Sequence, residues 1–347
     1  ETSGRFALQL KDFEQAQSIF KRLVMLAPNQ PQYFNMFMDL VMNSKNYEVG
    51  IGLIESLNNE YGESTERMAQ LGLLLYRTGK SEEALKLLES AVNDSPENPN
   101  YYFSLFDIYL DARENEKASE IADQLIANFP EDWRGYYSRS LVFMNQNKPQ
   151  AVISLLEPVS DSFVKIYSIQ YLLGLSHNQM KQFDEARKYL SNALKIRPDS
   201  PNVLHTMAIL YDEIEDWDKS DEIYKRLIKA DSTDAQAFNN YAYSLVERNE
   251  QLNKALELAK QAIDLEPENP SYLDTIGWIY FKLNNVNKAR EYIEASIKIT
   301  GDNAVVLEHL GDVFMKNKNP ETALGFYKRA LNLDKSNERL IKKASTD

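Results

Sequence analysis

The chain has 347 residues, of which 43% are hydrophobic and 26% charged, a composition typical of a protein that buries a large core. Its formal net charge of −13 at pH 7 disfavours binding to nucleic acid and to anionic membranes, which need patches of Lys and Arg. The lack of cysteine excludes disulfides, thiolate nucleophiles and thiolate metal sites. No apolar stretch reaches the roughly 18 residues of a membrane-spanning helix.

A small residue recurs at a nearly constant interval along the whole chain, each time within an amphipathic pattern that predicts a helix. The nine successive spacings lie between 33 and 35 residues. A period of this length predicts a solenoid built from helical repeats. The recurring residues are Ala16, Gly50, Ala84, Ala118, Ala151, Ala186, Ser220, Ala255, Ala289 and Ala323.

Residues 1–30 are expected to form an incomplete first repeat. Gly4 and Ala7 match the small and apolar positions late in a first helix, which predicts that the natural chain extends upstream. Without that extension, the apolar stripe of Phe13, Ala16 and Phe20 is expected to lack part of its cover.

Nine complete repeats are predicted over residues 31–335, each with a first helix, a short turn and a second helix. The first helices are expected to begin at residues 31, 65, 99, 133, 167, 201, 235, 270 and 304. Proline suits the first position of a helix, and it stands at Pro31, Pro99, Pro201 and Pro270. The residues before three of these prolines are good N-caps, namely Asn98, Ser200 and Asn269.

Three segments depart from this pattern. In the repeat from 133, Ala151 comes one residue early and Pro149 and Pro158 bracket a short second helix, so we expect an irregularity over residues 133–166, with a hinge or subdomain boundary as a further prediction. The repeat from 235 carries one extra residue in its inter-helix turn. Residues 336–347 are expected to cap the solenoid with a short helix that has a polar face.

The pattern within the repeats resembles the tetratricopeptide repeat family. In the repeat from 65, the residues that carry the resemblance are Leu71, Gly72, Leu75, Ala84, Leu88 and Pro96. The resemblance covers essentially the whole chain. It implies an all-α, right-handed superhelical solenoid of about ten helix-turn-helix repeats, a single domain over residues 1–347 with at least eighteen helices and no sheet.

Residues suited to catalysis or metal binding are few. The three histidines, His177, His205 and His309, lie in different repeats without metal-ligand spacing, and we interpret them as packing or surface residues. The acidic run over residues 212–222 lacks the glycine and the terminal glutamate of a calcium-binding loop. Motifs for phosphate binding and for activated nucleophiles are also missing. We therefore predict no catalytic residue, no metal and no cofactor.

The resemblance also implies that first-helix positions line a concave face on which members of the family bind partners. Aromatic residues give a large contact area at low entropic cost, although some of them could instead pack inside the wall. Two adjacent asparagines resemble the asparagine that grips a peptide backbone in other family members. The predicted partner-binding residues are Tyr76, Phe103, Tyr137, Tyr171, Asn239, Asn240, Tyr243, Trp278 and Phe281.

The groove positions are predicted to be acidic. The acids at these positions are Asp39, Glu66, Asp107, Asp111, Asp212, Glu213, Glu247, Asp274, Glu308 and Asp312. The bases are Arg77, Arg134, Lys282 and Lys316, which leaves 4 − 10 = −6. This balance predicts a neutral or basic protein segment with apolar anchors as the partner, and it disfavours nucleic acid.

The sequence therefore predicts a non-catalytic scaffold that binds a partner polypeptide in its concave groove. Two alternatives stay open: the adaptor region of a larger enzyme, and a structural solenoid that self-associates into homo-oligomers. We expect no membrane insertion by this chain. The regular repeats resemble those of bacterial proteins, for which a periplasmic or envelope setting, as a processed lipoprotein, competes with the cytoplasm.

Overall fold

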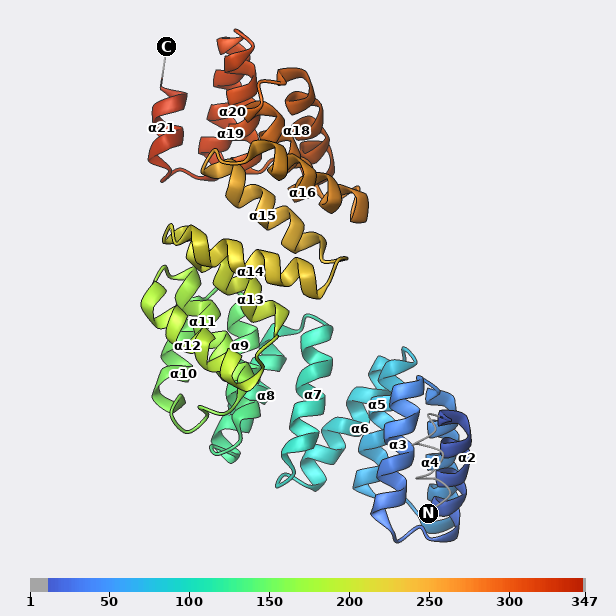
Figure 1. The fold of residues 1–347 in the computed structure, drawn as a ribbon. Helices are drawn as coiled ribbons and strands as arrows, with labels where there is room; N and C mark the ends of the chain where they lie inside the picture. Colours follow the sequence, from blue (N-terminus) through green and yellow to red (C-terminus); the bar gives the residue numbers. More distant parts are fainter. Residues whose placement is uncertain (1–11, 346–347) are drawn as a thin grey trace. The chain divides into compact units, whose positions relative to one another are not determined.

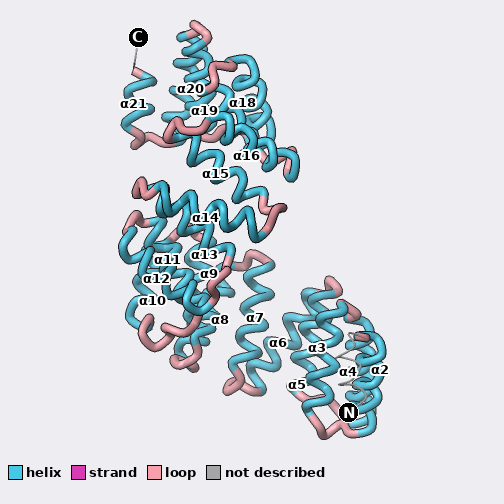
Figure 2. Tube along the Cα trace, in the orientation of Figure 1, coloured by secondary structure: helices cyan, strands magenta, loops and turns pink. Residues whose placement is uncertain are grey.

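The computed structural model describes residues 12–345, and these residues form helices joined by short turns, without any strand (Figures 1 and 2). They make up 20 α-helices and one short 3-10 helix, which confirms the predicted all-helical class. Gly4 and Ala7, on which the predicted upstream extension rests, lie outside the described residues.

The chain divides into two compact units. One ends at Met180 and the other begins at Lys181, and we call them the N-terminal unit and the C-terminal unit. The helices of the N-terminal unit are α2 (Phe13–Leu26), α3 (Pro31–Ser44), α4 (Tyr47–Tyr61), α5 (Thr65–Arg77), α6 (Ser81–Asp94), α7 (Pro99–Asp111), α8 (Asn115–Asn128), α9 (Trp133–Asn145), α10 (Pro149–Leu156), η1 (Glu157–Val159) and α11 (Tyr167–Gln179).

The C-terminal unit continues the same alternation of first and second helices. Its helices are α12 (Phe183–Ile196), α13 (Pro201–Glu213), α14 (Trp217–Ala230), α15 (Ala235–Glu247), α16 (Leu252–Leu265), α17 (Pro270–Lys282), α18 (Val286–Thr300), α19 (Ala304–Lys316), α20 (Pro320–Leu333) and α21 (Glu338–Ala344).

The nine first helices begin at the residues expected from the sequence. Four of them start on the expected proline, where the missing N–H costs no hydrogen bond. The side chains of Asn98 and Asn269 each accept a hydrogen bond of 3.1 Å from the backbone N–H two residues later, and Ser200 stands at the N-cap position of α13. Local capping chemistry therefore fixes where several repeats begin.

The recurring small residues let the helices of a repeat approach closely. Ala84, Ala118, Ala186, Ser220 and Ala255 have no exposed surface. The expected loss of cover on α2 is wrong for two of its three residues, because Ala16 and Phe20 are completely buried in the core of the N-terminal unit. The third, Phe13, is half exposed.

The irregular repeat is present where the sequence predicts it. Helix α10 has only 8 residues and is followed by the 3-10 helix η1, which contains Pro158. Val152, 34 residues after Ala118, is completely buried, whereas Ala151 is only partly buried. The two compact units separate at Met180, beyond the segment 133–166 in which a boundary was expected.

The other two departures are also present. The turn between α15 and α16 spans residues 248–251, one residue more than the turn between α13 and α14 at residues 214–216, and Gln251 adopts a left-handed φ of 43°. Helix α21 is the last helix of the described residues and buries Leu340 completely, while most of its other residues are exposed.

Candidate functional site

Three of the predicted binding residues form an aromatic row in the N-terminal unit. Phe103, Tyr137 and Tyr171 are each the fifth residue of a first helix, in α7, α9 and α11. All three are half-buried. Tyr137 meets Trp133 edge to face at 5.8 Å between ring centroids, and Tyr171 stacks on its own helix neighbour Tyr167 at 6.0 Å. The row therefore presents broad, partly exposed aromatic surface.

Carboxylates lie beside this aromatic row. The hydroxyl of Tyr76, a fourth predicted binding residue, donates a hydrogen bond of 3.2 Å to Asp111 Oδ2. Burial and the nearby Asp111 carboxylate raise the pKa of Asp107 to about 6, against the opposing effect of Arg77. Burial and the Asp107 charge also raise the pKa of Tyr137, so Asp107 and Tyr137 share one environment.

The raised pKa of Asp107 predicts a pH-dependent gain in stability for Asp107→Asn. Because the pKa of Asp107 in the folded protein lies above the ordinary 3.8, ionisation of this carboxyl opposes folding. Its contribution to the free energy of unfolding therefore falls as pH rises from about 4 through about 6. Two pKa units correspond to roughly 3 kcal/mol, which solvent screening reduces to about 1 kcal/mol because part of the Asp107 side chain remains in contact with water. We expect the variant to be about 1 kcal/mol more stable than the parent near pH 8, and equal to it near pH 4.

Urea unfolding at the two pH values measures this difference. Asp111→Asn serves as a control, because it removes the charge that helps to raise the pKa of Asp107. The Asp107 titration midpoint, followed by NMR, is expected to fall in that variant. An equal gain for Asp107→Asn at both pH values would contradict the electrostatic explanation.

The fifth position of the first helices changes character in the C-terminal unit. It carries the buried polar residues His205, Asn239, Asp274 and Glu308 in α13, α15, α17 and α19. His205 Nε2 lies 2.9 Å from Asp234, and His309 Nδ1 lies 3.0 Å from Asp274. These histidines pair with carboxylates, an arrangement that their sequence spacing gave no means of predicting.

The two predicted asparagines lie together on α15. Asn239 Nδ2 donates a hydrogen bond of 3.3 Å to Asn240 Oδ1, whereas Asn239 Oδ1 is buried without a hydrogen-bond partner. Asn240 and Tyr243 both line two adjoining hollows, which we call the acidic hollow and the polar hollow. This part of α15 therefore presents several predicted binding residues to open space.

The acidic hollow has a volume of about 480 Å³. It is lined by Ile209, Asp212, Glu213, Glu215, Trp217, Tyr224, Asn240, Tyr243, Ser244 and Glu247. Ile209 and Tyr243 are 38% and 36% exposed. The lining thus combines four carboxylates with apolar surface, and no Lys or Arg of the described chain belongs to it.

Hydrogen bonds hold part of the acidic hollow in place. Asp212 accepts from the Tyr224 hydroxyl at 2.8 Å and from Ser244 Oγ at 2.7 Å. Burial nevertheless raises the pKa of Asp212. Burial, together with Glu247, also raises the pKa of Tyr243, so its hydroxyl stays protonated and can donate a hydrogen bond.

The last two predicted residues form a stack on α17. The Trp278 ring stacks on Phe281 at 4.8 Å and on His309 at 4.1 Å between centroids, and its Nε1 donates to Glu247 Oε1 at 2.8 Å. Only 7% of Trp278 is exposed, whereas Phe281 is half-buried beneath Lys316 Nζ. Trp278 therefore supports the wall of the groove and offers little surface to a partner.

The polar hollow has a volume of about 320 Å³ and is lined by α15, α17, α18, α19 and the turn that joins α18 to α19. Its lining is formed by Asn239, Asn240, Tyr243, Pro270, Ser271, Asp274, Thr275, Ser296, Thr300, Asn303, Val305 and Val306. Asp274 is the single acidic residue in this set. Sequence reasoning missed Ser296, because it belongs to a second helix.

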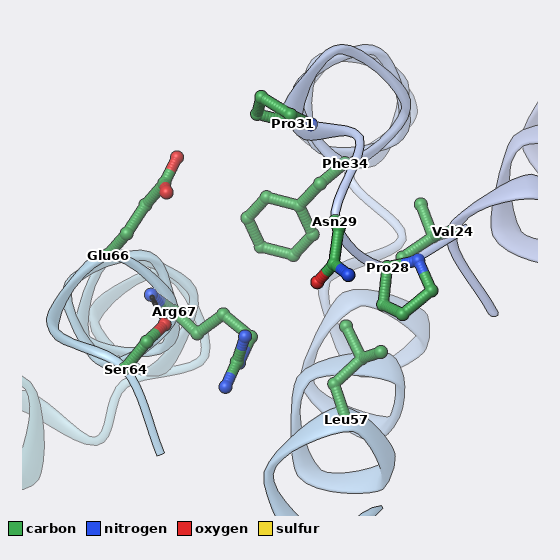
Figure 3. Close-up of a pocket in the computed structure, with 9 residues that line it drawn as sticks. All are labelled: Val24, Pro28, Asn29, Pro31, Phe34, Leu57, Ser64, Glu66 and Arg67. Atoms are coloured by element: carbon green, nitrogen blue, oxygen red, sulfur yellow. Dashed lines mark hydrogen bonds between the residues drawn. The ribbon is translucent and has the colours of Figure 1, made fainter. Parts of the chain in front are cut away.

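A cleft of about 280 Å³ lies in the N-terminal unit (Figure 3). Phe34 of α3 and Arg67 of α5 point toward its centre in Figure 3, whereas Glu66 points away. The Arg67 guanidinium donates from Nε to Asn58 Oδ1 at 2.8 Å and from Nη2 to the Gly62 carbonyl oxygen. A cation of the protein itself, the Arg67 guanidinium, therefore already lies in this cleft.

Helix α21 changes the charge count expected from the sequence. Arg339 Nη2 donates to Glu308 Oε2 at 2.8 Å, and Lys343 Nζ lies 2.6 Å from Asp312 Oδ1 and 2.8 Å from Glu308 Oε1. Two of the ten predicted groove acids are thus neutralised by residues outside the count. Of the predicted groove acids in this unit, Glu213 and Glu247 are exposed, and both line the acidic hollow.

Within residues 12–345, no three His, Asp or Glu side chains gather closely enough to hold a metal ion. None of the helices described combines the length and the apolar character that crossing a membrane requires.

Comparison with known families and structures identifies the repeat. A family model described as tetratricopeptide repeat matches residues 56–335, and a second of the same description matches residues 2–30. The solved structure of the Cut9–Hcn1 hetero-tetramer of the APC/C is similar over 98% of this chain and 74% of its own, with 12% identity and a TM-score of 0.60. Yeast Tom70 is similar over 98% of this chain and 85% of its own, with 12% identity and a TM-score of 0.52.

Two curated proteins are similar in sequence. The TPR repeat-containing protein PA4667 of Pseudomonas aeruginosa is 31% identical over 120 residues, which are 33% of this chain and 20% of that protein. The BBSome complex member BBS4 of Bos taurus is 22% identical over 268 residues, which are 75% of this chain and 51% of that protein. The chain thus spans between a fifth and about half of the length of these relatives.

Proposed function

The chain belongs to the tetratricopeptide repeat family, and from this premise we propose that it is a non-catalytic scaffold that binds a segment of a partner protein along the groove of its first helices. The observation that carries the proposal is the acidic hollow. Ile209 and Tyr243 expose apolar surface there beside the carboxylates of Glu213 and Glu247. A segment with basic residues and an apolar anchor complements this surface in both charge and polarity.

The names of similar proteins support an interaction role. One is a member of the BBSome complex, and one solved structure is a hetero-tetramer from the APC/C. Proteins of this fold are generally scaffolds, and a solenoid presents an extended surface without the enclosed site that catalysis needs. The sequence leaves a bacterial envelope setting and a cytoplasmic setting equally open, and fractionation of cells carrying the natural gene would distinguish them.

Tyr243→Ala tests the proposed groove most directly. Peptides selected on the intact protein from a random displayed library are expected to be enriched in Lys, Arg and large apolar residues. Tyr243 lines both hollows and is 36% exposed. Its truncation is therefore expected to weaken the binding of these peptides by about 30-fold or more, which is the effect of one hot-spot aromatic residue. Tyr61→Ala is the matched control, since Tyr61 is 49% exposed on α4 and lines neither hollow.

Charge variants separate the electrostatic part of the proposal from the apolar part. Replacing Glu213, Glu215 and Glu247 with Gln is expected to slow association of the basic peptides and to reduce its dependence on salt. Selection of acidic or purely apolar peptides, or an equal loss for Tyr61→Ala and Tyr243→Ala, would show that another surface binds the partner.

A further inference from the structure

Two buried polar atoms in the polar hollow lack hydrogen-bond partners. Asn239 Oδ1 and Ser296 Oγ are unpaired, although their residues are only 7% and 1% exposed. A buried polar atom without a partner costs about 1–3 kcal/mol, so native proteins rarely retain one without reason. The carbonyl oxygen of Asn239 can only accept, and the Ser296 hydroxyl can also accept. A ligand group rich in donors would satisfy both atoms.

The charge of the polar hollow favours a cation. Asp274 contributes a carboxylate that is only 7% exposed and is held at 3.0 Å by His309 Nδ1. A carboxylate has about four acceptor sites, so this contact leaves several unused. No Lys or Arg among the described residues lines the hollow, and the nearby Arg339 is bound to Glu308. A group that carries positive charge and several donors therefore matches the lining.

The cleft of Figure 3 occupies a comparable place in the N-terminal unit. Helices α4 and α18 both have 15 residues, and each is followed by a glycine at the C-cap, Gly62 with φ of 77° and Gly301 with φ of 75°. Position 27 of the repeat is Leu57 in the repeat that begins at residue 31 and Ser296 in the repeat that begins at residue 270. Both residues line their respective hollows. The two repeats therefore share the same local backbone and differ in the side chains that fill it.

The difference concerns a guanidinium group. The third residue of the following first helix is Arg67 in α5 and Val306 in α19. Figure 3 shows Arg67 directed from α5 into the cleft, where Asn58 and the Gly62 carbonyl accept its hydrogen bonds. Val306 offers no donor, so the repeat of α17 and α18 has the same backbone without an internal guanidinium.

We propose that the polar hollow is a subsite for an arginine side chain of the bound protein segment. The proposal deepens the proposed function and rests on it. Asn239 Oδ1, Ser296 Oγ and the Asp274 carboxylate come from three different helices. The planar guanidinium presents five donors in a fixed fork and reaches such dispersed acceptors better than the compact ammonium of lysine.

Small arginine derivatives test the subsite without knowledge of the natural partner. The probe is N-acetyl-arginine N-methylamide, and the controls are its citrulline and lysine counterparts, of which citrulline keeps the shape without the charge. The side-chain amide of Asn239 is followed by NMR in the full chain. We expect saturable shifts with arginine, about tenfold weaker binding of citrulline and a smaller loss with lysine. Equal binding of arginine and citrulline, or no saturable shift with arginine, would overturn the proposal.

Three substitutions locate the binding. Asp274→Asn is expected to weaken binding of the arginine probe by about tenfold, because the substitution removes the negative charge and keeps the shape of the side chain. Val306→Arg places an internal guanidinium where Arg67 lies in the other repeat, and it is expected to abolish binding. Ser296→Leu reproduces Leu57, narrows the hollow and gives a second test if Val306→Arg does not fold. Unchanged binding of the probe by the folded variants would overturn the proposal.

Failure of the arginine subsite can be distinguished from failure of the proposed scaffold function. If library peptides still depend on Tyr243 while the arginine probe fails, the subsite is wrong and the scaffold function stands. If the probe binds while no library peptide does, the scaffold function loses its support and the hollow is a site for small cationic molecules.

Discussion

Gly311→Ala is expected to lower the free energy of unfolding by about 2 kcal/mol, because the added methyl group has no room. A Cβ atom at this position would overlap the Tyr327 ring, with Cδ1 at 2.6 Å and Cε1 closer still. The ring cannot easily move away, since Tyr327 is 2% exposed and its hydroxyl donates to Asp312 Oδ1 at 2.7 Å. The clash outweighs the gain of about 1 kcal/mol that Gly→Ala gives within a helix.

Gly325→Ala is the matched control in the same repeat. Nothing lies within 4 Å of a Cβ atom at Gly325, which is an exposed residue within α20. The same substitution is therefore expected to raise the free energy of unfolding by about 0.5–1 kcal/mol. Urea unfolding followed by circular dichroism measures both changes. Equal effects of the two substitutions would mean that the close approach of α19 and α20 does not limit the stability of this repeat.

The fold could be predicted from the sequence because each repeat carries the same local signals. The N-cap residue and the proline that follows it mark the start of several first helices, and the small residue recurs within the second helices, so the spacing of these signals reports the helix boundaries directly. The short α10 was also predictable, since Pro149 and Pro158 bracket it. The boundary at Met180 was not, because it depends on contacts between helices and not on any local breaker residue.

The candidate site was less accessible to sequence reasoning. The position of a residue within the repeat predicts whether it belongs to the groove, but it does not predict how deeply its side chain is buried. Tyr243 and Trp278 are both the ninth residue of a first helix, yet they are 36% and 7% exposed. The difference arises because Trp278 stacks on His309 of the next repeat and bonds to Glu247 of the preceding one. Such contacts between repeats depend on the identities of several side chains at once.

The role of α21 was partly predictable. Helix α21 begins at Glu338, and 338 − 304 = 34, so it starts one repeat period after α19. The register therefore places α21 at the position of a first helix, which explains why its cations reach acids at first-helix positions of α19. A count of charges restricted to the complete repeats omits these cations.

The ion pairs of α21 predict a large effect for Arg339→Ala combined with Lys343→Ala. Glu308 is 1% exposed, and Arg339 Nε and Lys343 Nζ each lie 2.8 Å from its Oε1. Removal of both cations leaves a buried carboxylate without a counter-charge, which costs about 3 kcal/mol or more. Asp312, which Lys343 also contacts, adds like-charge repulsion. We expect the last complete repeat, formed by α19 and α20, to lose stability before the rest of the chain.

Hydrogen exchange measured by mass spectrometry tests this expectation at the level of single helices. Peptides from α19 and α20 are expected to exchange about 100-fold faster in the double variant, while those from α13 keep their parental rates. Lys328→Ala with Lys335→Ala is the control, because it removes two positive charges from exposed positions. Adding Glu308→Gln to the double variant is expected to restore at least half of the lost protection, since it removes the unpaired buried charge. If that third substitution restores nothing, the contribution of α21 comes from the packing of Leu340, which is completely buried, and not from the two cations.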